Sequence, residues 1–385
     1  MKIALITDGI WPYVMGGMQK HSFYLCKYFA KNKIYVDLVH FNQSKLEIDA
    51  LDVFSDEEKK YINSIIVDFP QLKKTPGHYL KASYLHSKLI FEKIKSNLAN
   101  YDFIYTKGFT GWYLIEQKKQ GKINCCKIGV KFHGYEMFQK APNFKIKLQQ
   151  LLLLKMPVKK LSLNADVVFS YGGKITEIIK KIGVANTKII ELPSGVEDDL
   201  IETTINKTSA PLNFLYLGRY ERRKGIEELN TVIKSLGIEF ANKANFNFIG
   251  NIPNNKRLNF KHVNYFGEVR DKLQLKNLIK QNDVLLCPSY SEGMPNVILE
   301  AMANGLTVIA TDVGATNVLI NNSNGFLLNK CNVKQIVNAI QKVVSLNRDE
   351  IDNKKQISLN LIKEKFTWQS LSVQLIKEIN TKISD

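Results

Sequence analysis

The feature that most constrains the fold is a regular alternation of short apolar runs with longer amphipathic stretches. In the first half of the chain, helical patterns such as residues 18–31 and 80–98 separate the apolar runs. Short buried runs joined by helical crossovers are typical of a parallel β-sheet. The runs of this first series are KIALIT (2–7), YVDLVHF (35–41), FIYTKG (103–108), KIGVKFHG (127–134) and DVVFSYG (166–172).

A second series of the same kind begins after Pro211. Its apolar runs are NFLYLGR (213–219), NFNFIGN (245–251), HVNYFGE (262–268), DVLLCPS (283–289) and LTVIATD (306–312). Two consecutive α/β series predict two doubly wound, Rossmann-like domains, and 385 residues are too many for a single usual core. We therefore predict a first domain over 1–192, a linker over 193–210, a second domain over 211–364 and an amphipathic C-terminal helix over 365–385.

The charge is strongly basic and unevenly distributed. The formal net charge of +18 comes from 54 Lys and Arg against 36 Asp and Glu. Residues 1–195 hold 30 Lys and Arg against 16 Asp and Glu, a net charge of +14, so residues 196–385 contribute the other +4. A basic half of this kind can face nucleic acid, an anionic membrane or an acidic substrate. Since no helix-turn-helix, zinc-finger or RNA-binding aromatic motif is present, a non-enzymatic nucleic-acid-binding protein is the less favoured alternative.

Cysteine usage and hydropathy indicate the compartment. The five cysteines form no C-x-x-C or Cys/His ligand spacing, which favours structural thiols in a reducing environment. The first apolar run is interrupted at Asp8 and reads as a strand rather than a signal peptide. No apolar run reaches the roughly 18–20 residues that cross a bilayer. We expect a soluble, cytoplasmic protein.

Ligands of open parallel sheets bind where strands end and helices begin. The first strand is followed by Gly16-Gly17, which either lets the backbone approach a phosphate or sugar or serves only as a turn. Without a G-x-G-x-x-G fingerprint, a dinucleotide cofactor is not expected. His133 follows the strand at 127–132 and is either a hydrogen-bond donor and proton carrier or a structural histidine.

The first strand of the second domain ends in LYLGRYERRKG, which places Arg219 and Lys224 on either side of a short loop. Two cations at a strand end suit a diphosphate and can neutralise a leaving group without a metal ion. The alternative is a solvated basic turn, and that is what we expect of the neighbouring Arg222 and Arg223.

The stretch SYSEGMPNVILEAMANG (289–305) holds two acids on either side of a helix start. Pro295 suits the first turn of a helix over 296–303, so Glu292 lies in the preceding loop and Glu300 in the second turn. A carboxylate can accept hydrogen bonds from two adjacent hydroxyl groups, as a ribose or a hexose presents them. We predict that the two acids bind different parts of one ligand; the alternative is a capped surface helix.

These motifs resemble, in the same order along the chain, those of retaining glycosyltransferases of family 4, which have the GT-B fold. Residues 292–300 resemble the E-x7-E signature, and FHGYE, LPSGVEDD and YLGRYERRKGIEEL are similar to further elements of that family. The resemblance implies two Rossmann-like domains that face a central cleft, with the last helix crossing back to the first domain. It also implies a hexosyltransferase that keeps the anomeric configuration of a UDP- or GDP-linked donor sugar.

The resemblance further implies a role for each matching residue. His133 faces the donor sugar near the reacting carbon, Glu292 binds that sugar and Glu300 holds the ribose. Arg219 and Lys224 bind the diphosphate, and these two, His133 and Glu292 are the expected catalytic residues. The remaining donor-binding residues are Gly16, Gly17, Gly293, Met294, Pro295, Asn296 and Val297. No metal ligand is expected, because no D-x-D motif follows a strand.

The acceptor is expected to meet the basic first domain. From Met137 to Ala165 no acid occurs, while lysines interleave with the run LLLL, which favours an amphipathic surface for anionic lipid over a solvated helix. We predict peripheral binding to the inner face of the cytoplasmic membrane through the region from Lys140 to Lys160. The predicted acceptor is a lipid-linked glycan of cell-surface polysaccharide or lipopolysaccharide biosynthesis. A sugar-nucleotide epimerase or hydrolase is the alternative within the same fold.

Overall fold

A seven-stranded parallel sheet forms the first half of the chain. The computed structural model describes residues 1–14, 16–41, 53–73, 75 and 77–384. The strand order of the first sheet is β3-β2-β1-β4-β5-β6-β7, which is doubly wound because the chain turns outward in both directions from β1. The strands are β1 (Lys2–Ile6), β2 (Tyr35–His40), β3 (Ile62–Ile66), β4 (Phe103–Lys107), β5 (Lys127–Lys131), β6 (Val167–Ser170) and β7 (Ile189–Glu191).

A six-stranded parallel sheet with the order β10-β9-β8-β11-β12-β13 forms the second half. Its strands are β8 (Leu212–Leu217), β9 (Ala244–Ile249), β10 (Val263–Gly267), β11 (Val284–Cys287), β12 (Thr307–Thr311) and β13 (Gly325–Leu328). The central strands of each sheet pair without a register shift. Ile3 of β1, for example, pairs with Val36 of β2 and with Phe103 of β4. Every strand expected from the two apolar series is therefore present.

Among the described residues, three strands lie outside the expected runs, and all three are at the edges of the sheets. β3 has the sequence INSII, β7 contains only three residues, and β13 has the sequence GFLL after Asn324. An edge strand has one hydrogen-bonded neighbour and needs no continuous apolar run. These short or mixed sequences therefore carried too weak a signal for prediction.

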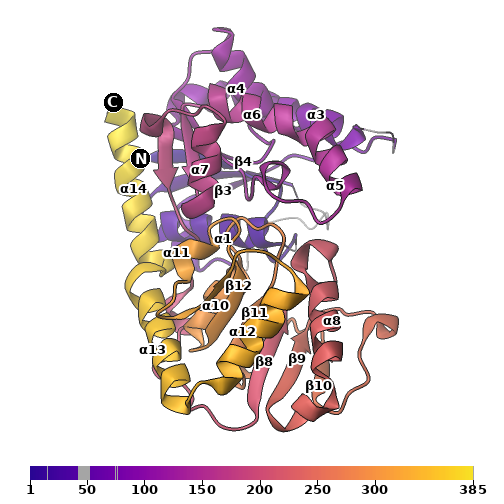
Figure 1. Cartoon of the computed structure of the whole chain (residues 1–385). Coiled ribbons are helices and arrows are strands. Elements are labelled where there is room, and N and C mark those ends of the chain that lie inside the picture. The colour runs from indigo at the N-terminus through magenta and orange to yellow at the C-terminus, as the bar shows by residue number, and fades with distance from the viewer. Residues whose placement is uncertain (15, 42–52, 74, 76, 385) are drawn as a thin grey trace.

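Helices cover both faces of each sheet (Figure 1). The helices of the first half are α1 (Gly17–Lys31), α2 (Asp56–Lys59), α3 (His78–Ile94), α4 (Trp112–Lys119), α5 (Phe144–Gln149), α6 (Lys155–Asn164) and α7 (Gly173–Lys181). Those of the second half are α8 (Ile226–Leu236), α9 (Lys272–Lys280), α10 (Asn296–Ala303), α11 (Thr316–Leu319), α12 (Val333–Ser345) and α13 (Arg348–Lys365). A π-helical turn, Gln150–Leu154, joins α5 to α6. Within the described ranges, no helix combines the length and the apolar character needed to cross a bilayer.

The last helix, α14 (Trp368–Ser384), runs beside the first sheet although it follows α13 of the second half (Figure 1). Four of its apolar side chains, Trp368, Leu371, Leu375 and Ile379, join a buried cluster that includes Phe23 of α1. Where α13 ends, the chain meets the segment that leaves the first sheet: Val196 N donates to Phe366 O at 2.8 Å, and Trp368 N donates to Val196 O at 3.0 Å. Two adjacent passages of the chain therefore connect the two halves.

Candidate active site

The carboxyl ends of the two sheets meet at three elements that are far apart in the sequence. Gly17 begins α1, His133 follows β5, and Asn296 begins α10. A Cβ atom at Gly17 would lie 3.2 Å from His133 Nε2 and 3.4 Å from Asn296 Nδ2. A Cβ atom at Gly293 would lie 1.7 Å from the backbone oxygen of His133, so only glycine permits this approach of the two halves. The structure thus brings together residues predicted from three separate motifs.

The other residues of the predicted donor set lie around this point. Gly16 immediately precedes α1, and Pro295 immediately precedes α10. Met294 is buried, and its sulfur lies 3.1 Å from the backbone nitrogen of Ser194. Val297 is partly buried against the core. The backbone of residues 293–297 therefore leads into the first turn of α10, and the unpaired N–H groups at the start of a helix attract anionic ligands.

Glu292 is a buried carboxylate with three partners. Only 6% of the residue is exposed, and its Oε1 accepts hydrogen bonds from both Lys224 Nζ, at 2.6 Å, and Ser289 Oγ, at 2.7 Å. Arg223 Nη1 approaches the other oxygen at 3.2 Å. Burial alone would raise the pKa of Glu292, but the two cations and the hydrogen bonds outweigh it and hold the pKa at about 2. The side chain is therefore ionised at neutral pH and fixed in position.

The expectation for Arg222 and Arg223 is wrong, because neither is a solvated turn residue. Arg222 donates two hydrogen bonds to Glu228, at 2.8 Å and 2.6 Å, and its guanidinium lies 4.9 Å from the centre of the Tyr290 ring. Arg223 donates to Ser291 O at 2.9 Å as well as to Glu292. Both arginines thus hold the loop before α10, and no spacing within the sequence distinguishes them from exposed residues.

Of the two residues predicted to bind the diphosphate, Arg219 and Lys224, only Lys224 contacts Glu292. The side chain of Arg219 is 78% exposed and pairs with Glu221 at 2.7 Å. An exposed ion pair of this kind contributes little to stability. Arg219 is therefore free to turn toward a ligand. Lys224, in contrast, has to leave the carboxylate of Glu292 before it can bind a phosphate group.

Glu300 lies in the second turn of α10, between the buried residues Leu299 and Ala301. Its carboxylate forms an ion pair with Lys20 of α1, on the opposite side of the junction between the sheets. An acid in a helix with little polar surface needs such a partner. The sequence indicated that need, but a partner 280 positions away carries no local signal.

His133 is held as a neutral imidazole. Its Nδ1 lies 2.8 Å from the hydroxyl of Tyr171, which follows β6. Burial, reinforced by the nearby side chains of Lys107 and Lys131, lowers the pKa of His133 to about 3. The carboxylate of Glu292 opposes this shift without overcoming it. Neutral histidine can donate or accept one hydrogen bond at the nitrogen that faces Gly17.

Two fully buried lysines lie beneath His133, and the sequence analysis missed both. Lys107 and Lys131 are neighbours in the register of β4 and β5, and each is 1% exposed. Lys107 Nζ donates to His21 Nδ1 at 2.7 Å, and Lys131 Nζ donates to Leu192 O at 2.7 Å. Burial lowers the pKa of Lys107 to about 7, although the carboxylate of Asp8 opposes the shift. The only available signal was a lysine at the end of each of two neighbouring apolar runs.

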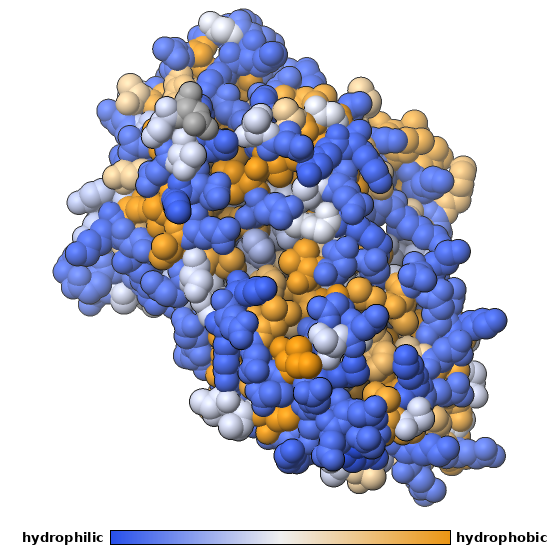
Figure 2. Space-filling view, turned by 60° about the vertical axis from the view of Figure 1, so that its left-hand side comes forward, coloured by the Kyte–Doolittle hydropathy of each residue, from blue (hydrophilic) through white to orange (hydrophobic). Residues whose placement is uncertain are grey.

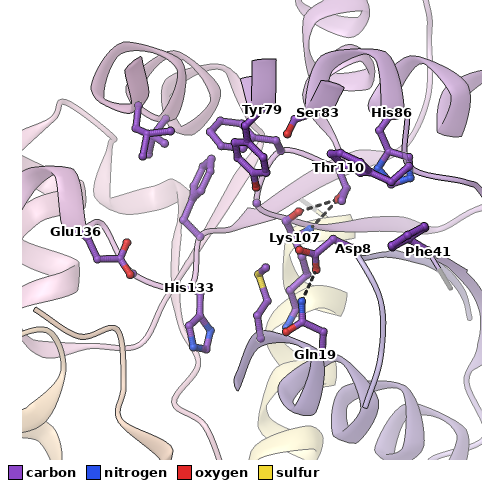
Figure 3. A pocket seen from close by; sticks show the side chains of 18 of the residues that line it. Asp8, Gln19, Phe41, Tyr79, Ser83, His86, Lys107, Thr110, His133 and Glu136 are labelled. Atoms are coloured by element: carbon purple, nitrogen blue, oxygen red, sulfur yellow. Dashed lines mark hydrogen bonds between the residues drawn. The ribbon is translucent and has the colours of Figure 1, made fainter. Parts of the chain in front are cut away.

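A cavity of about 450 Å³ adjoins His133 in the first half of the molecule (Figure 3). Figure 3 shows Asp8, Gln19 and Lys107 on one side of this cavity and Glu136 on the other. Gln19 Nε2 donates to Asp8 Oδ1 at 3.1 Å, and burial raises the pKa of Asp8. The aromatic side chains that line the cavity are Phe41, Phe69, Tyr79, Phe109, Phe132 and Tyr135. Leu154 and Val158, from the π-helical turn and α6, complete another part of the wall.

Among the residues that the structure describes, no group of three or more His, Cys, Asp and Glu side chains is arranged to hold a metal ion. The five cysteines are all free thiols.

Comparisons with known proteins identify the second half of the chain. The family of glycosyl transferases group 1 matches residues 199–358. A glycosyltransferase of Methanocaldococcus jannaschii, MJ1178, is 26% identical over 355 residues, which cover 88% of this chain and 91% of that protein. TuaC of Bacillus subtilis, named as a glycosyltransferase of teichuronic acid biosynthesis, is 31% identical over 189 residues. That alignment covers 46% of this chain and 47% of TuaC, so the chain matches about half the length of this relative.

Solved structures match the whole chain. Sucrose-phosphate synthase from Thermosynechococcus elongatus superposes with a TM-score of 0.78 at 19% identity, covering 100% of this chain and 99% of that one. The lipopolysaccharide outer core galactosyltransferase WaaB superposes with a TM-score of 0.69 at 20% identity and the same coverage. At these identities the likeness concerns the fold. The chain therefore has the GT-B fold of two facing Rossmann-like domains, and its second domain is a glycosyltransferase group 1 domain.

Proposed function

We propose that the protein transfers a hexose from a UDP- or GDP-linked donor to an acceptor hydroxyl and keeps the anomeric configuration. The observation that carries the proposal is the arrangement of Glu292, His133 and Gly17 around the N-terminus of α10. It offers a fixed carboxylate for sugar hydroxyls, a neutral imidazole and a helix start for phosphate at the junction of the two sheets. The match of residues 199–358 to glycosyl transferases group 1 supports the same chemistry.

In this proposal the cations of the second domain receive the diphosphate. Lys224 moves from Glu292 to a phosphate oxygen, Arg219 turns in from solvent, and Glu292 then accepts hydrogen bonds from the donor sugar. Arg223 and Ser289 keep Glu292 in place during this exchange. Glu300 leaves Lys20 and binds the ribose. The diphosphate leaving group is stabilised by these cations and by the start of α10, and a phosphate oxygen of the donor accepts the acceptor proton.

Donor binding is tested by thermal shift with a panel of UDP- and GDP-sugars. We expect one donor class to stabilise the protein, and Glu300→Ala to weaken its binding about 10-fold, because a charged hydrogen bond is worth about 1.5–3 kcal/mol. Glu364→Ala, which removes an exposed acid from α13, is the matched control and should bind as the wild type does. A panel without any stabilising donor would argue against the proposed function.

Stereochemistry is tested by proton NMR of the product. Two relatives are named as α-1,3-glycosyltransferases, the galactosyltransferase of Escherichia coli and the N-acetylgalactosaminyltransferase of Campylobacter jejuni. With an α-linked donor, retention gives an α-linked product and inversion gives a β-linked one. Rapid consumption of the donor without any acceptor would instead favour an epimerase or a hydrolase.

A lipid-linked glycan is the acceptor that we propose, and the cavity beside His133 is the place for its sugar. The same two relatives are named for diphosphoundecaprenol-linked acceptors. A volume of about 450 Å³ lies within the usual range of about 300–1,000 Å³ for small-molecule sites. The aromatic wall suits the apolar face of a sugar ring, and Asp8 with Gln19 suits its hydroxyl groups.

The segment from α5 to α6, residues 144–164, supports a membrane-facing role. Its exposed apolar side chains include Phe144 (77% exposed), Leu152 (69%) and Met156 (67%), interleaved with lysines and without any acid. Figure 2 shows hydrophobic side chains in several patches on both halves of the molecule, surrounded by hydrophilic ones. Leu154 and Val158 of the same segment face the cavity. One helical segment therefore presents apolar side chains to the outside and also forms a wall of the proposed acceptor site.

Co-sedimentation with vesicles tests this surface. We expect binding to vesicles that contain an anionic phospholipid and weak binding to neutral ones, because lysines and apolar side chains act together. Leu152→Glu should reduce binding about 10-fold or more, since a buried leucine contributes about 1.5–3 kcal/mol. Leu273→Glu is the matched control, because Leu273 of α9 is exposed to a similar extent, 66%, in the second domain. Equal loss in both variants, or no binding by the wild type, would contradict the role of this segment.

A further inference from the structure

The hydroxyl of Tyr171 determines which nitrogen of His133 carries the proton. Tyr171 Oη lies 2.8 Å from His133 Nδ1, and the two rings meet edge to face at 88°. The other nitrogen, Nε2, is the one that approaches Gly17 at the junction of the domains. A neutral imidazole has one N–H donor and one acceptor nitrogen, so the bond at Nδ1 fixes the character of Nε2.

The direction of this hydrogen bond follows from the partners that Tyr171 has. In the described part of the chain, His133 Nδ1 is the hydrogen-bond partner of the Tyr171 hydroxyl, and no second one occurs. If the imidazole donated, the phenolic hydrogen would remain buried without an acceptor, which costs about 1–3 kcal/mol. Burial raises the pKa of Tyr171, so its hydroxyl stays protonated and able to donate. The hydroxyl therefore donates to Nδ1, and the proton of His133 resides on Nε2.

Two further side chains, Lys131 and His21, contact the ring of Tyr171 and hold it in this orientation. Its ring is 1% exposed, and Lys131 Nζ lies 3.8 Å from the ring centre. Lys131 is in turn fixed by its hydrogen bond to Leu192 O. On another side the ring contacts His21 edge to face, and His21 contacts Trp368 of α14 in the same manner. A buried ring with contacts on several sides cannot turn its hydroxyl away from His133 without disrupting the core.

We propose that Tyr171 is a positioning residue that makes His133 present its Nε2–H group to an oxygen atom of the donor sugar. The sugar as ligand rests on the proposed function, whereas the tautomer does not. In this state His133 is a hydrogen-bond donor toward the cleft and has no lone pair there to act as a base. The geometry thus assigns His133 the recognition of a sugar oxygen and leaves proton acceptance to another group.

The tautomer is measured by ¹⁵N-detected imidazole NMR on the intact protein. The wild type should show a protonated Nε2 and an unprotonated Nδ1 for His133, identified among the six histidines by its loss in His133→Gln. Tyr171→Phe should change this pattern toward a mixture of tautomers. It should also lower kcat about 10-fold or more while the KM of the donor changes less, because a wrong tautomer mainly affects the reacting complex.

Tyr105→Phe is the matched control. Tyr105 is also fully buried in the first sheet, but its hydroxyl has no hydrogen-bond partner in the described structure, so its loss should leave the His133 signals and kcat unchanged. A protonated Nδ1 in the wild type would overturn the inference, even if Tyr171→Phe did not fold. Unchanged His133 signals in a folded Tyr171→Phe variant would also overturn it. If the protein bound no nucleotide sugar, the proposed function would fail while the tautomer could still be observed.

Discussion

Ionisable side chains are buried at the carboxyl ends of both sheets, but of those described only the ones of the second sheet have partners of opposite charge. In the first domain, Lys107 and Lys131 are buried beside a neutral histidine and a backbone oxygen, and no acid contacts either ammonium group within the described residues. In the second domain, Glu292 is buried among Lys224 and Arg223, which balance its charge. A buried ionisable group without an opposite charge shifts its pKa toward the neutral form, whereas a paired one remains ionised. The lysines of the first sheet thus shift toward their neutral forms, whereas the carboxylate of the second sheet stays charged.

Removal of Glu292 should give the largest effect. Glu292→Ala leaves Lys224 and Arg223 without their shared carboxylate, so we expect a loss of about 3 kcal/mol in stability and of about 100- to 1,000-fold in transfer rate. Denaturant unfolding and steady-state kinetics measure the two effects. Asp283→Ala is the matched control, since Asp283 is another buried acid paired with a lysine, Lys355, but it precedes β11 instead of following it. Comparable activity losses in both variants would mean that Glu292 serves stability alone.

Lys107, which has no acidic partner within the described ranges, should make stability rise with pH, as the paired Glu292 does, but between about pH 7 and 10.5 instead of in the acid range. The pKa of Lys107 is about 7 in the folded protein against an ordinary value of 10.5, so the unfolded chain binds more protons between these values and stability rises with pH there. From about pH 7 to about pH 9.5 the wild type should gain about 3 kcal/mol relative to Lys107→Met. Denaturant unfolding of both proteins across this range measures the difference. A constant difference would show that Lys107 is not held near neutrality.

The ion pair between Lys20 of the first domain and Glu300 of the second should have the smallest effect on donor binding. Lys20 and Glu300 are both partly exposed, and in the proposed mechanism Lys20 competes with the ribose for the carboxylate. Lys20→Met should therefore tighten donor binding about 2- to 5-fold, opposite in sign to Glu300→Ala, because a weak ion pair no longer has to be broken. Added salt should reduce the difference between wild type and variant, since it screens the pair. Calorimetric titration with the donor at low and high salt provides the measurement, and weaker binding by Lys20→Met would contradict the competition.

Features of the site that depend on local sequence could be predicted. Pro295 and the apolar pattern that follows define the start of α10, so the separation of Glu292 in the loop from Glu300 in the helix followed directly. The central strands were also predictable, because continuous apolar runs mark strands that are buried on both faces. The edge strand β7 was not, since three residues provide too short a pattern.

Features that depend on contacts between distant segments could not be predicted. Arg223 binds Glu292 across 69 positions, and Lys20 binds Glu300 across 280. In sequence Arg223 looks the same as an exposed arginine, because its burial is created by the loop that folds over it. The buried lysines were missed for a related reason: a lysine at a strand end is normally solvated, and only the packing of His21, Tyr171 and Leu192 around them excludes water.

The two passages of the chain between the domains limit how the cleft can move. Val196 exchanges backbone hydrogen bonds with Phe366 and Trp368, and a Cβ atom at Gly195 would lie only 2.9 Å from Trp368 N. These two hydrogen bonds and the close approach at Gly195 tie the two passages together side by side. The passages therefore act as one joint instead of two independent tethers, and any change in the relative position of the domains has to keep this joint intact or break its hydrogen bonds.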